Sequence, residues 1–244
     1  MSAPSHNFME QANVSPTRYT PPRLTDILPR ENLYAFLDER WNRKLTIVSA
    51  RAGQGKSTTI ADYLNSRKRN FFWYNLDAKD HVLPFLVSSI LRYFAERKPD
   101  ERKDKPSQTE IPSGASPEES ASGLARFLSR ETVDDFTLVF DNFQEVNEAE
   151  YICRFFLHLV EALPLRFHVI IVSRTHPALN LVRFRSEKEL TELSDRDLWF
   201  GCQEISSLFH QIYRVFPDES LIASLYDRFA GWITGYIFIL DTVF

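Results

Sequence analysis

The chain contains 244 residues with a formal net charge of −4, from 29 basic and 33 acidic side chains. Hydrophobic residues make up 43% and charged residues 25%, a composition that excludes wholesale disorder. No overall positive field exists to hold nucleic acid through its phosphates. Only two cysteines occur, Cys153 and Cys202, which excludes a disulfide framework and indicates a reducing compartment. The polar N-terminus does not resemble a signal peptide, and no long apolar run appears, so we expect a cytoplasmic protein without a membrane partner.

Residues 1–22 are polar and rich in Ser, Pro and Asn, which predicts a flexible lead-in. After them, apolar patterning predicts helices that alternate with short, nearly continuous apolar strands. Such alternation is typical of an α/β fold with a parallel sheet covered by helices, which we assign to residues 23–200. In chain order, we expect a helix over Pro29–Leu37, a strand at Leu45–Ser49, a helix over Ser57–Arg67, a strand at Phe71–Asn75, a helix over Pro84–Glu96, a helix over Ala121–Glu131, a strand at Phe136–Phe140, a helix over Ala149–Leu163, and strands at His168–Ser173 and Lys188–Leu193.

Residues 96–120 interrupt this alternation. Twelve of these 25 positions are charged and four are proline, and only Ile111 and Ala115 are apolar. Such a segment buries too little surface to order itself, which predicts an exposed, disordered insertion. A charged binding tail is the alternative, but mixed signs favour a solvated loop.

From Gln203 onward the pattern is helical, and residues 201–244 are expected to open a helical domain. The sequence stops inside the apolar stretch Trp232–Phe244, which would leave an apolar surface uncovered. We therefore expect the chain to be the front part of a longer protein.

The segment Ala50–Ser57 lies between an expected strand and an expected helix and carries the chemistry of a phosphate-binding loop. Gly53 and Gly55 let backbone N–H groups converge on phosphate oxygens, Lys56 supplies a cation, and Ser57 supplies a hydroxyl for Mg²⁺. Ala50 replaces the first glycine of the usual Gly-x₄-Gly-Lys-Ser/Thr pattern. The context predicts a Mg²⁺–nucleotide site, and a glycine turn without a ligand is the alternative.

Two further residues follow neighbouring strands. Asp141 ends the apolar run 137–141 and is a candidate carboxylate on the Mg²⁺ side, although an acid that merely caps the strand end would look the same. Arg174 follows the strand 169–173, at the sheet edge where ligands of open α/β sheets bind. It is a candidate sensor of the γ-phosphate, and a surface ion pair is its alternative role.

These motifs, taken together, resemble the MalT-like STAND ATPases, whose members are commonly LuxR-type transcriptional regulators. The resemblance spans roughly residues 20–240, and its more specific parts are the Trp-x-x-Leu-Asp segment, Ser-Arg-Thr-x-Pro and the late Gly-Trp. The matching segments are Pro21–Leu24, Pro29–Arg30, Ala50–Thr58, Trp73–Asp77, Leu138–Phe143, Ser173–Pro177 and Gly231–Gly235.

The resemblance implies a five-stranded core with the strand before the glycine loop in a central position, and ATP or ADP bound with Mg²⁺. It assigns Lys56, Asp141 and Arg174 to catalysis, with Arg174 as the first sensor, and Ser57 and Asp141 to the metal. Arg30 is expected near the base or ribose, with a helix-capping role as the alternative. The expected nucleotide-binding residues are Arg30, Ala52, Gly53, Gln54, Gly55, Lys56, Ser57 and Thr58.

Three departures from the family pattern concern catalysis and the base. Asn142 replaces the second acid of an Asp-Asp pair, Phe143-Gln144 replaces the following Tyr-x, and Ile233 replaces the proline of Gly-x-Pro. An amide cannot act as a general base, so we expect slow hydrolysis unless Glu145 or Gln144 positions the water.

The resemblance implies a signal-responsive switch that rests with ADP and self-associates when ATP and an inducer, which the sequence does not identify, are bound. DNA would be contacted only by a C-terminal helix-turn-helix that these residues do not contain. Two alternatives are a free-standing ATPase or kinase-like phosphotransferase, and an interaction module that binds nucleotide without hydrolysing it.

Overall fold

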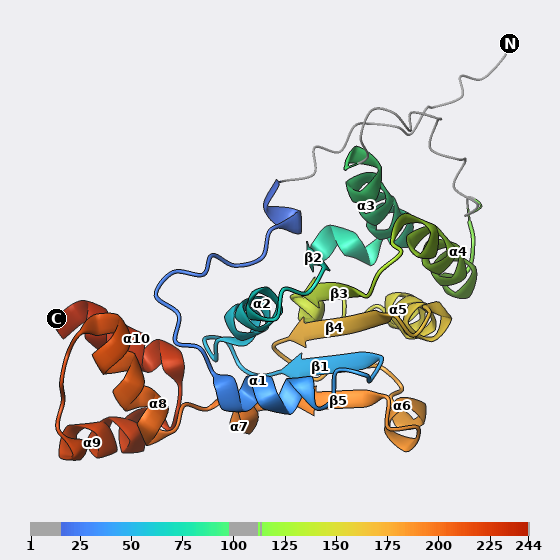
Figure 1. Cartoon of the computed structure of the whole chain (residues 1–244). Helices are drawn as coiled ribbons and strands as arrows, with labels where there is room; N and C mark the ends of the chain where they lie inside the picture. Colours follow the sequence, from blue (N-terminus) through green and yellow to red (C-terminus); the bar gives the residue numbers. More distant parts are fainter. Residues whose placement is uncertain (1–15, 98–111, 113, 244) are drawn as a thin grey trace, which may run out of the picture.

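A computed structural model describes residues 16–97, 112 and 114–243 of the chain. Its centre is a parallel five-stranded sheet in the order β2-β3-β4-β1-β5, with helices on both faces (Figure 1). The predicted fold class is therefore confirmed. The strands are β1 (Leu45–Ser49), β2 (Phe71–Asn75), β3 (Phe136–Asp141), β4 (Phe167–Ser173) and β5 (Leu190–Leu193).

The apolar runs that predicted the strands reflect burial on both sheet faces. All seven residues of β4 are buried, as are the first four of β1. The strand β1 pairs with β4 on one side and with the edge strand β5 on the other. It is therefore an interior strand, but the middle position that the resemblance implied for it belongs to β4.

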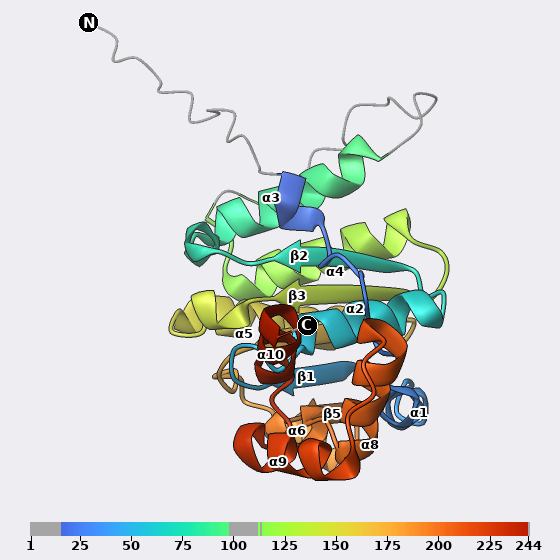
Figure 2. The same cartoon turned by 90° about the vertical axis from the view of Figure 1, so that its left-hand side faces the viewer.

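Side chains alternate across the sheet and enter two separate cores. Ile47 packs into the core formed with α3 (Leu83–Glu96), α4 (Pro117–Glu131), α5 (Glu150–Ala162) and α6 (Val182–Ser186). Its neighbour Val48 packs into the core formed with α1 (Glu31–Asp38) and α2 (Lys56–Ser66). Figure 2 shows α1 and α2 on one side of the sheet, with α10 in front of the strand ends.

The end of the expected flexible lead-in is ordered. A 3-10 helix, η1 (Pro16–Tyr19), packs against the edge strand β2. Arg18 is buried and donates to Tyr74 Oη at 2.9 Å and to Asp80 at 2.6 Å, and it also pairs with Asp77. The prediction of a flexible segment over residues 1–22 is therefore wrong for residues 16–22, while residues 1–15 lie outside the described part.

The expected insertion is also shorter at its C-terminal end than predicted. The helix α4 begins at Pro117, not at Ala121, because Ser116 caps it. Ser116 Oγ accepts the Glu119 N–H at 3.2 Å, and the Glu119 carboxylate accepts the Ser116 N–H at 2.8 Å. This reciprocal pair satisfies two donors of the first turn and makes a helix from residues that are polar and charged. Residues 98–111 and 113 lie outside the described part.

The final elements form a helical unit, defined here as residues 202–243. It lies beyond the carboxyl ends of the strands (Figure 1) and has its own apolar core. Leu28 and Phe200, which precede this unit in the sequence, complete that core. Along the described residues, no helix has the length and apolar character needed to cross a bilayer. The unit comprises α8 (Cys202–Ser207), the π-helix η5 (Leu208–Tyr213), α9 (Glu219–Phe229) and α10 (Ile233–Val243); the short elements before it are η2 (Ala78–His81), η4 (Phe143–Glu145) and α7 (Asp195–Leu198).

Candidate functional site

The strand register brings the three predicted site segments to one edge of the sheet. Ser49, the last residue of β1, lies beside Ser173, the last residue of β4. Asp141, the last residue of β3, lies beside Asn75 of β2. The loop after β1 and the residue Arg174 after β4 therefore begin at the same edge that carries Asp141.

The loop 50–55 has the shape of an anion-binding cradle. Gly53 and Gly55 adopt φ values of 75° and 76°, in the left-handed region that favours glycine, and α2 begins directly after them at Lys56. The loop therefore delivers free N–H groups and the positive end of a helix dipole to one point. Ala50 is buried and does not have a positive φ, so alanine replaces the first glycine of the pattern without strain.

The ammonium group of Lys56 is held inside the loop without a carboxylate partner. Lys56 Nζ donates to the Arg51 carbonyl at 2.9 Å, and the residue is only 8% exposed. Among the described residues, no acidic side chain lies within ion-pair distance of it. Burial lowers its pKa, whereas the more distant Asp141 carboxylate opposes this effect. A buried and unpaired cation at the start of a helix favours an anionic ligand.

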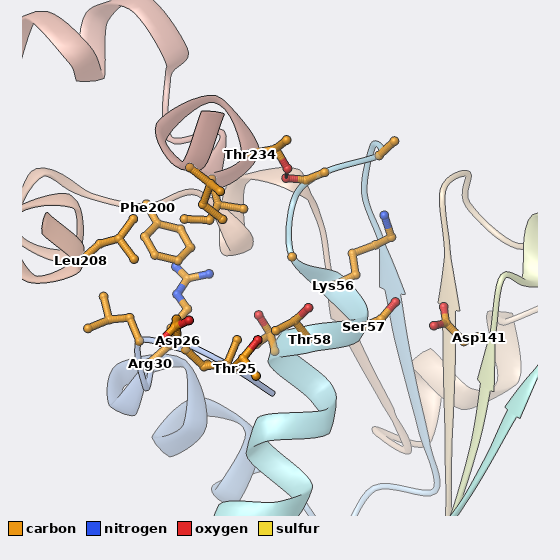
Figure 3. Close-up of a pocket in the computed structure, with 18 of the residues that line it drawn as sticks. Thr25, Asp26, Arg30, Lys56, Ser57, Thr58, Asp141, Phe200, Leu208 and Thr234 are labelled. Atoms are coloured by element: carbon orange, nitrogen blue, oxygen red, sulfur yellow. Dashed lines mark hydrogen bonds between the residues drawn. The ribbon is translucent and has the colours of Figure 1, made fainter. Parts of the chain in front are cut away.

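Asp141 is the predicted acid, and the structure places it beside the start of α2. Its side chain is buried, which raises its pKa; the nearby Ser57 hydroxyl and the Asn142 N–H oppose this shift. The Asn142 N–H donates to Asp141 Oδ1 at 2.8 Å. Figure 3 shows Lys56, Ser57 and Asp141 side by side on their neighbouring elements. A hydroxyl beside a buried carboxylate is an oxygen donor set of the kind that Mg²⁺ prefers.

Arg174 and Gln144 are joined by a hydrogen bond between the loops after β3 and β4. The Arg174 N–H donates to Gln144 Oε1 at 3.0 Å, while Gln144 Nε2 lies 3.4 Å from Asn142 Oδ1. Arg174, Gln144 and Asn142 line the cavity described next, whereas Glu145 does not. Of the two residues expected to position a water, only Gln144 is therefore on the cavity wall.

A cavity of about 600 Å³ runs from the glycine loop to the helical unit. Of the eight predicted nucleotide-binding residues, seven line it, and so do the predicted catalytic residues Asp141 and Arg174. Gln54 is the exception, because its side chain is almost fully buried and is not part of the wall. The predicted lining residues are Arg30, Ala52, Gly53, Gly55, Lys56, Ser57 and Thr58.

Arg30 lies in the wall of this cavity, but its polar atoms are bound to other protein groups. Arg30 Nε donates to Glu204 at 2.7 Å, and the two terminal nitrogens donate to the carbonyls of Leu198 and Trp199 at 2.8 and 2.9 Å. The guanidinium lies over the Phe200 ring, 4.4 Å from its centroid. Arg30 therefore connects the segment before α1 to the helical unit (Figure 3).

Most residues at the end of the cavity away from the glycine loop could not be predicted from the sequence. Its wall combines residues that precede α1 with residues of η5 and α10, which lie far apart in the sequence. Arg30, expected near the base or ribose, and the Gly231–Gly235 motif pointed to this region. The missed lining residues are Thr25, Asp26, Ile27, Leu28, Tyr34, Thr59, Phe200, Leu208, Tyr213, Thr234, Ile237 and Asp241, to which the structure adds Asn142, Gln144 and Ile233 from the departures noted above.

These observations fit a nucleotide. One end of the cavity offers free N–H groups, an unpaired lysine and a hydroxyl–carboxylate pair, which suit phosphate and a divalent cation. The other end offers the apolar side chains of Ile27, Leu208 and Ile237, which suit a base. Its volume lies in the range of about 300–1,000 Å³ that small-molecule sites occupy. Within the described ranges, no three His, Cys, Asp or Glu side chains gather into a separate metal site.

The fold and the glycine loop are those of a P-loop NTPase. A STAND protein with a tetratricopeptide repeat sensor, PH0952 from Pyrococcus horikoshii, has the same fold with a TM-score of 0.55 over 94% of this chain and 32% of that one, at 17% identity. Residues 24–174 match the family described as "Nephrocystin 3, N-terminal", and the chain belongs to that family.

The relatives of this chain include transcriptional regulators named MalT. The chain is 28% identical over 230 residues to the HTH-type transcriptional regulator MalT of Yersinia pestis (strain Pestoides F), and 31% identical over 227 residues to that of Serratia proteamaculans (strain 568). Each match covers 88% of this chain and 24% of the relative, so the chain spans about a quarter of their length. The resemblance to MalT-like STAND ATPases is thus confirmed.

Proposed function

We propose that this chain binds ATP or ADP together with Mg²⁺ in the cavity between the glycine loop and the helical unit. The observation that carries the proposal is the buried Lys56, which lies at the start of α2 inside a glycine loop and has no acidic partner among the described residues. A buried cation without a directly paired counter-charge is costly, and a bound phosphate would supply such a pair.

In this proposal each predicted residue has a distinct task. Lys56 and the N–H groups of the loop hold the phosphates, and Ser57 and Asp141 hold Mg²⁺ directly or through water. Arg174 senses the terminal phosphate from the end of β4. The metal, when bound, neutralises charge on the phosphate oxygens.

We further propose that the nucleotide acts as a signal in a transcriptional regulator of the MalT type, with self-association in the ATP state and an inducer that is still to be identified. DNA would be contacted by a helix-turn-helix outside these 244 residues, in keeping with the name of the relatives. We also propose a cytoplasmic location, which the sequence predicts. Light scattering of the purified chain in ATP and in ADP tests the contribution of ATP to self-association, and an equal mass in both nucleotides would contradict self-association driven by ATP alone.

A second candidate is an interaction module that binds nucleotide without turnover. Asn142 favours it, because this amide lies on the cavity wall next to Asp141 and cannot accept a proton from water. A free-standing ATPase is the third possibility. Steady-state turnover distinguishes the three, since an ATPase requires rates well above those of a slow switch.

Calorimetric titration with Mg-ADP and Mg-ATP tests the binding site itself. Lys56→Ala should weaken binding by about 10- to 100-fold, because a charged hydrogen bond contributes about 1.5–3 kcal/mol. Lys79→Ala is the matched control, since Lys79 is exposed on η2 and should leave the affinity unchanged. Circular dichroism confirms that both variants are folded. Equal nucleotide affinity in the wild type and in Lys56→Ala would overturn the assignment.

A further inference from the structure

The start of α10 contacts the outer side of the glycine loop. Trp232 Nε1 donates to the Ala52 carbonyl at 3.2 Å, and Thr234 Oγ1 donates to the Gly53 carbonyl at 2.7 Å. The Thr234 N–H also points to the Gly53 carbonyl, at 3.4 Å. Figure 3 shows Thr234 directly beside the loop, on the side opposite to the β3 strand that carries Asp141. Two successive carbonyls of the loop are therefore bound by one short segment of the helical unit.

This contact occupies the space that a side chain at position 53 would need. A Cβ atom on Gly53 would lie 2.6 Å from Thr234 Oγ1 and 2.7 Å from Trp232 Nε1, closer than real Cβ contacts come. Glycine is thus required at position 53 for its φ of 75° and also because the helical unit approaches the backbone there. Gly55 makes a looser contact, since its Cβ would lie 3.5 Å from Ile233.

The segment before α10 is itself fixed in place. The Phe200 N–H donates to the Gly231 carbonyl at 3.0 Å, and the Gly231 N–H donates to Tyr236 Oη at 2.9 Å. The carbonyls of the adjacent residues 198 and 199 are held by Arg30, as described above. The position of Trp232 and Thr234 against the loop is therefore set by the packing of the whole helical unit.

The bound carbonyls belong to the same peptide groups as two N–H donors of the cradle. The Ala52 carbonyl shares its peptide with the Gly53 N–H, and the Gly53 carbonyl shares its peptide with the Gln54 N–H. Donation to a carbonyl polarises the peptide and makes its N–H a stronger donor, by about 10–30% per bond. It also fixes the plane of the peptide, so that the N–H direction is set before a ligand binds.

We propose that Trp232 and Thr234 are positioning residues of the phosphate site, which hold these two peptides in the anion-binding orientation. Docking of the helical unit and binding of phosphate then strengthen each other, because a coupling between two binding events is reciprocal. The inference rests on the proposed nucleotide function and adds the route by which the helical unit senses the phosphates.

The experiment measures the affinity of the full chain for ADP and for inorganic pyrophosphate, which has no base or ribose and so does not need the apolar end of the cavity. Thr234→Val removes the hydroxyl at nearly constant volume, and Trp232→Phe removes the indole N–H. Each should weaken both ligands about two- to tenfold, the value of one net hydrogen bond. Thr234→Ser, which keeps the hydroxyl, should restore the wild-type affinity.

The outcomes separate the two proposals. Failure of the wild type to bind either ligand would overturn the proposed function itself. Binding by the wild type with unchanged affinity in Thr234→Val and Trp232→Phe would overturn only the positioning role. Equal loss of affinity in Thr234→Ser and Thr234→Val would also overturn it, because the hydroxyl would then not be the active group. If Thr234→Val does not fold, Trp232→Phe gives an independent measurement of the same coupling.

Discussion

The buried His168 makes the stability of the sheet core sensitive to acid. His168 lies near the start of β4, and its Nε2 atom is 2.9 Å from Thr46 Oγ1 on the neighbouring strand β1. Its ring is stacked on Trp41, with centroids 4.5 Å apart and planes 13° from parallel. Burial lowers the pKa of His168 from 6.5 to about 4.

The sign of the effect follows from this lowered pKa. Above about pH 6.5 the imidazole is neutral in both the folded and the unfolded chain, so the full stability is present. As the pH falls from 6.5 towards 4, His168 is protonated in the unfolded chain but stays neutral in the folded chain. The free energy of unfolding therefore decreases over this range. A shift of about 2.5 pKa units corresponds to a loss of about 3 kcal/mol at the acid limit and about 2 kcal/mol near pH 5.

Urea unfolding followed by tryptophan fluorescence tests this value, with wild type and His168→Gln compared at about pH 7.5 and about pH 5. Glutamine can still form a hydrogen bond with Thr46 but does not titrate. The free energy of unfolding of the wild type should fall by about 2 kcal/mol more than that of the variant, since contributions of other groups cancel in the difference. An equal fall in both proteins would refute the reasoning. Nucleotide titrations should be carried out above about pH 6.5, where His168 does not reduce the stability of the fold.

Three further predictions test the remaining assignments. Arg18→Met should lower the free energy of unfolding by about 3–5 kcal/mol, because it leaves the buried Asp80 without its cation. A change below about 1 kcal/mol in urea unfolding would show that the η1 contact contributes little to stability. Ser116→Ala should cost about 1 kcal/mol through loss of the α4 cap, measured in the same way, whereas an unchanged midpoint would contradict the cap. Asn142→Asp should raise the single-turnover rate of ATP hydrolysis, since a general base contributes about 10²–10⁴-fold, and Asp141→Ala should reduce Mg²⁺-dependent turnover. Brisk hydrolysis in the wild type without a gain in Asn142→Asp would assign the base to another residue.

The strands could be predicted because burial on both sheet faces leaves a signal in each strand alone. The run Leu45–Ser49 is apolar at three of its five positions, and the structure assigns β1 to the same five residues. The lead-in could not be predicted in this way. Arg18 stands in a polar segment, which is typical of solvated chain, and its partners Asp77 and Asp80 lie about 60 residues further on. Nothing within residues 1–22 indicates that an ion pair will bury this arginine.

The helix α4 illustrates a local signal that composition obscured. Residues 117–120 include two glutamates and a proline, which suggested that they continue the charged insertion. In sequence order, however, Ser116, Pro117 and Glu119 form a capping box with proline in the first turn. The charge that argues against order in the middle of a segment stabilises a helix at its N-terminus, where the dipole is positive. Position relative to the helix start, and not composition, decided the structure here.

The two ends of the cavity differ in how far the sequence alone predicts them. The glycine-loop end consists of one contiguous loop and the ends of two strands, so a motif and the parallel topology were sufficient to predict that Lys56, Ser57 and Asp141 lie together there. The other end is assembled from residues 25–28 and 200–241, which only the docking of the helical unit brings together. Arg30 stands between these cases: the resemblance placed it near the nucleotide, and it does line the cavity, but its donors hold Glu204 and two carbonyls. An effect of Arg30 on nucleotide affinity would therefore be transmitted through the helical unit, and so through the same contacts that hold α10 against the glycine loop.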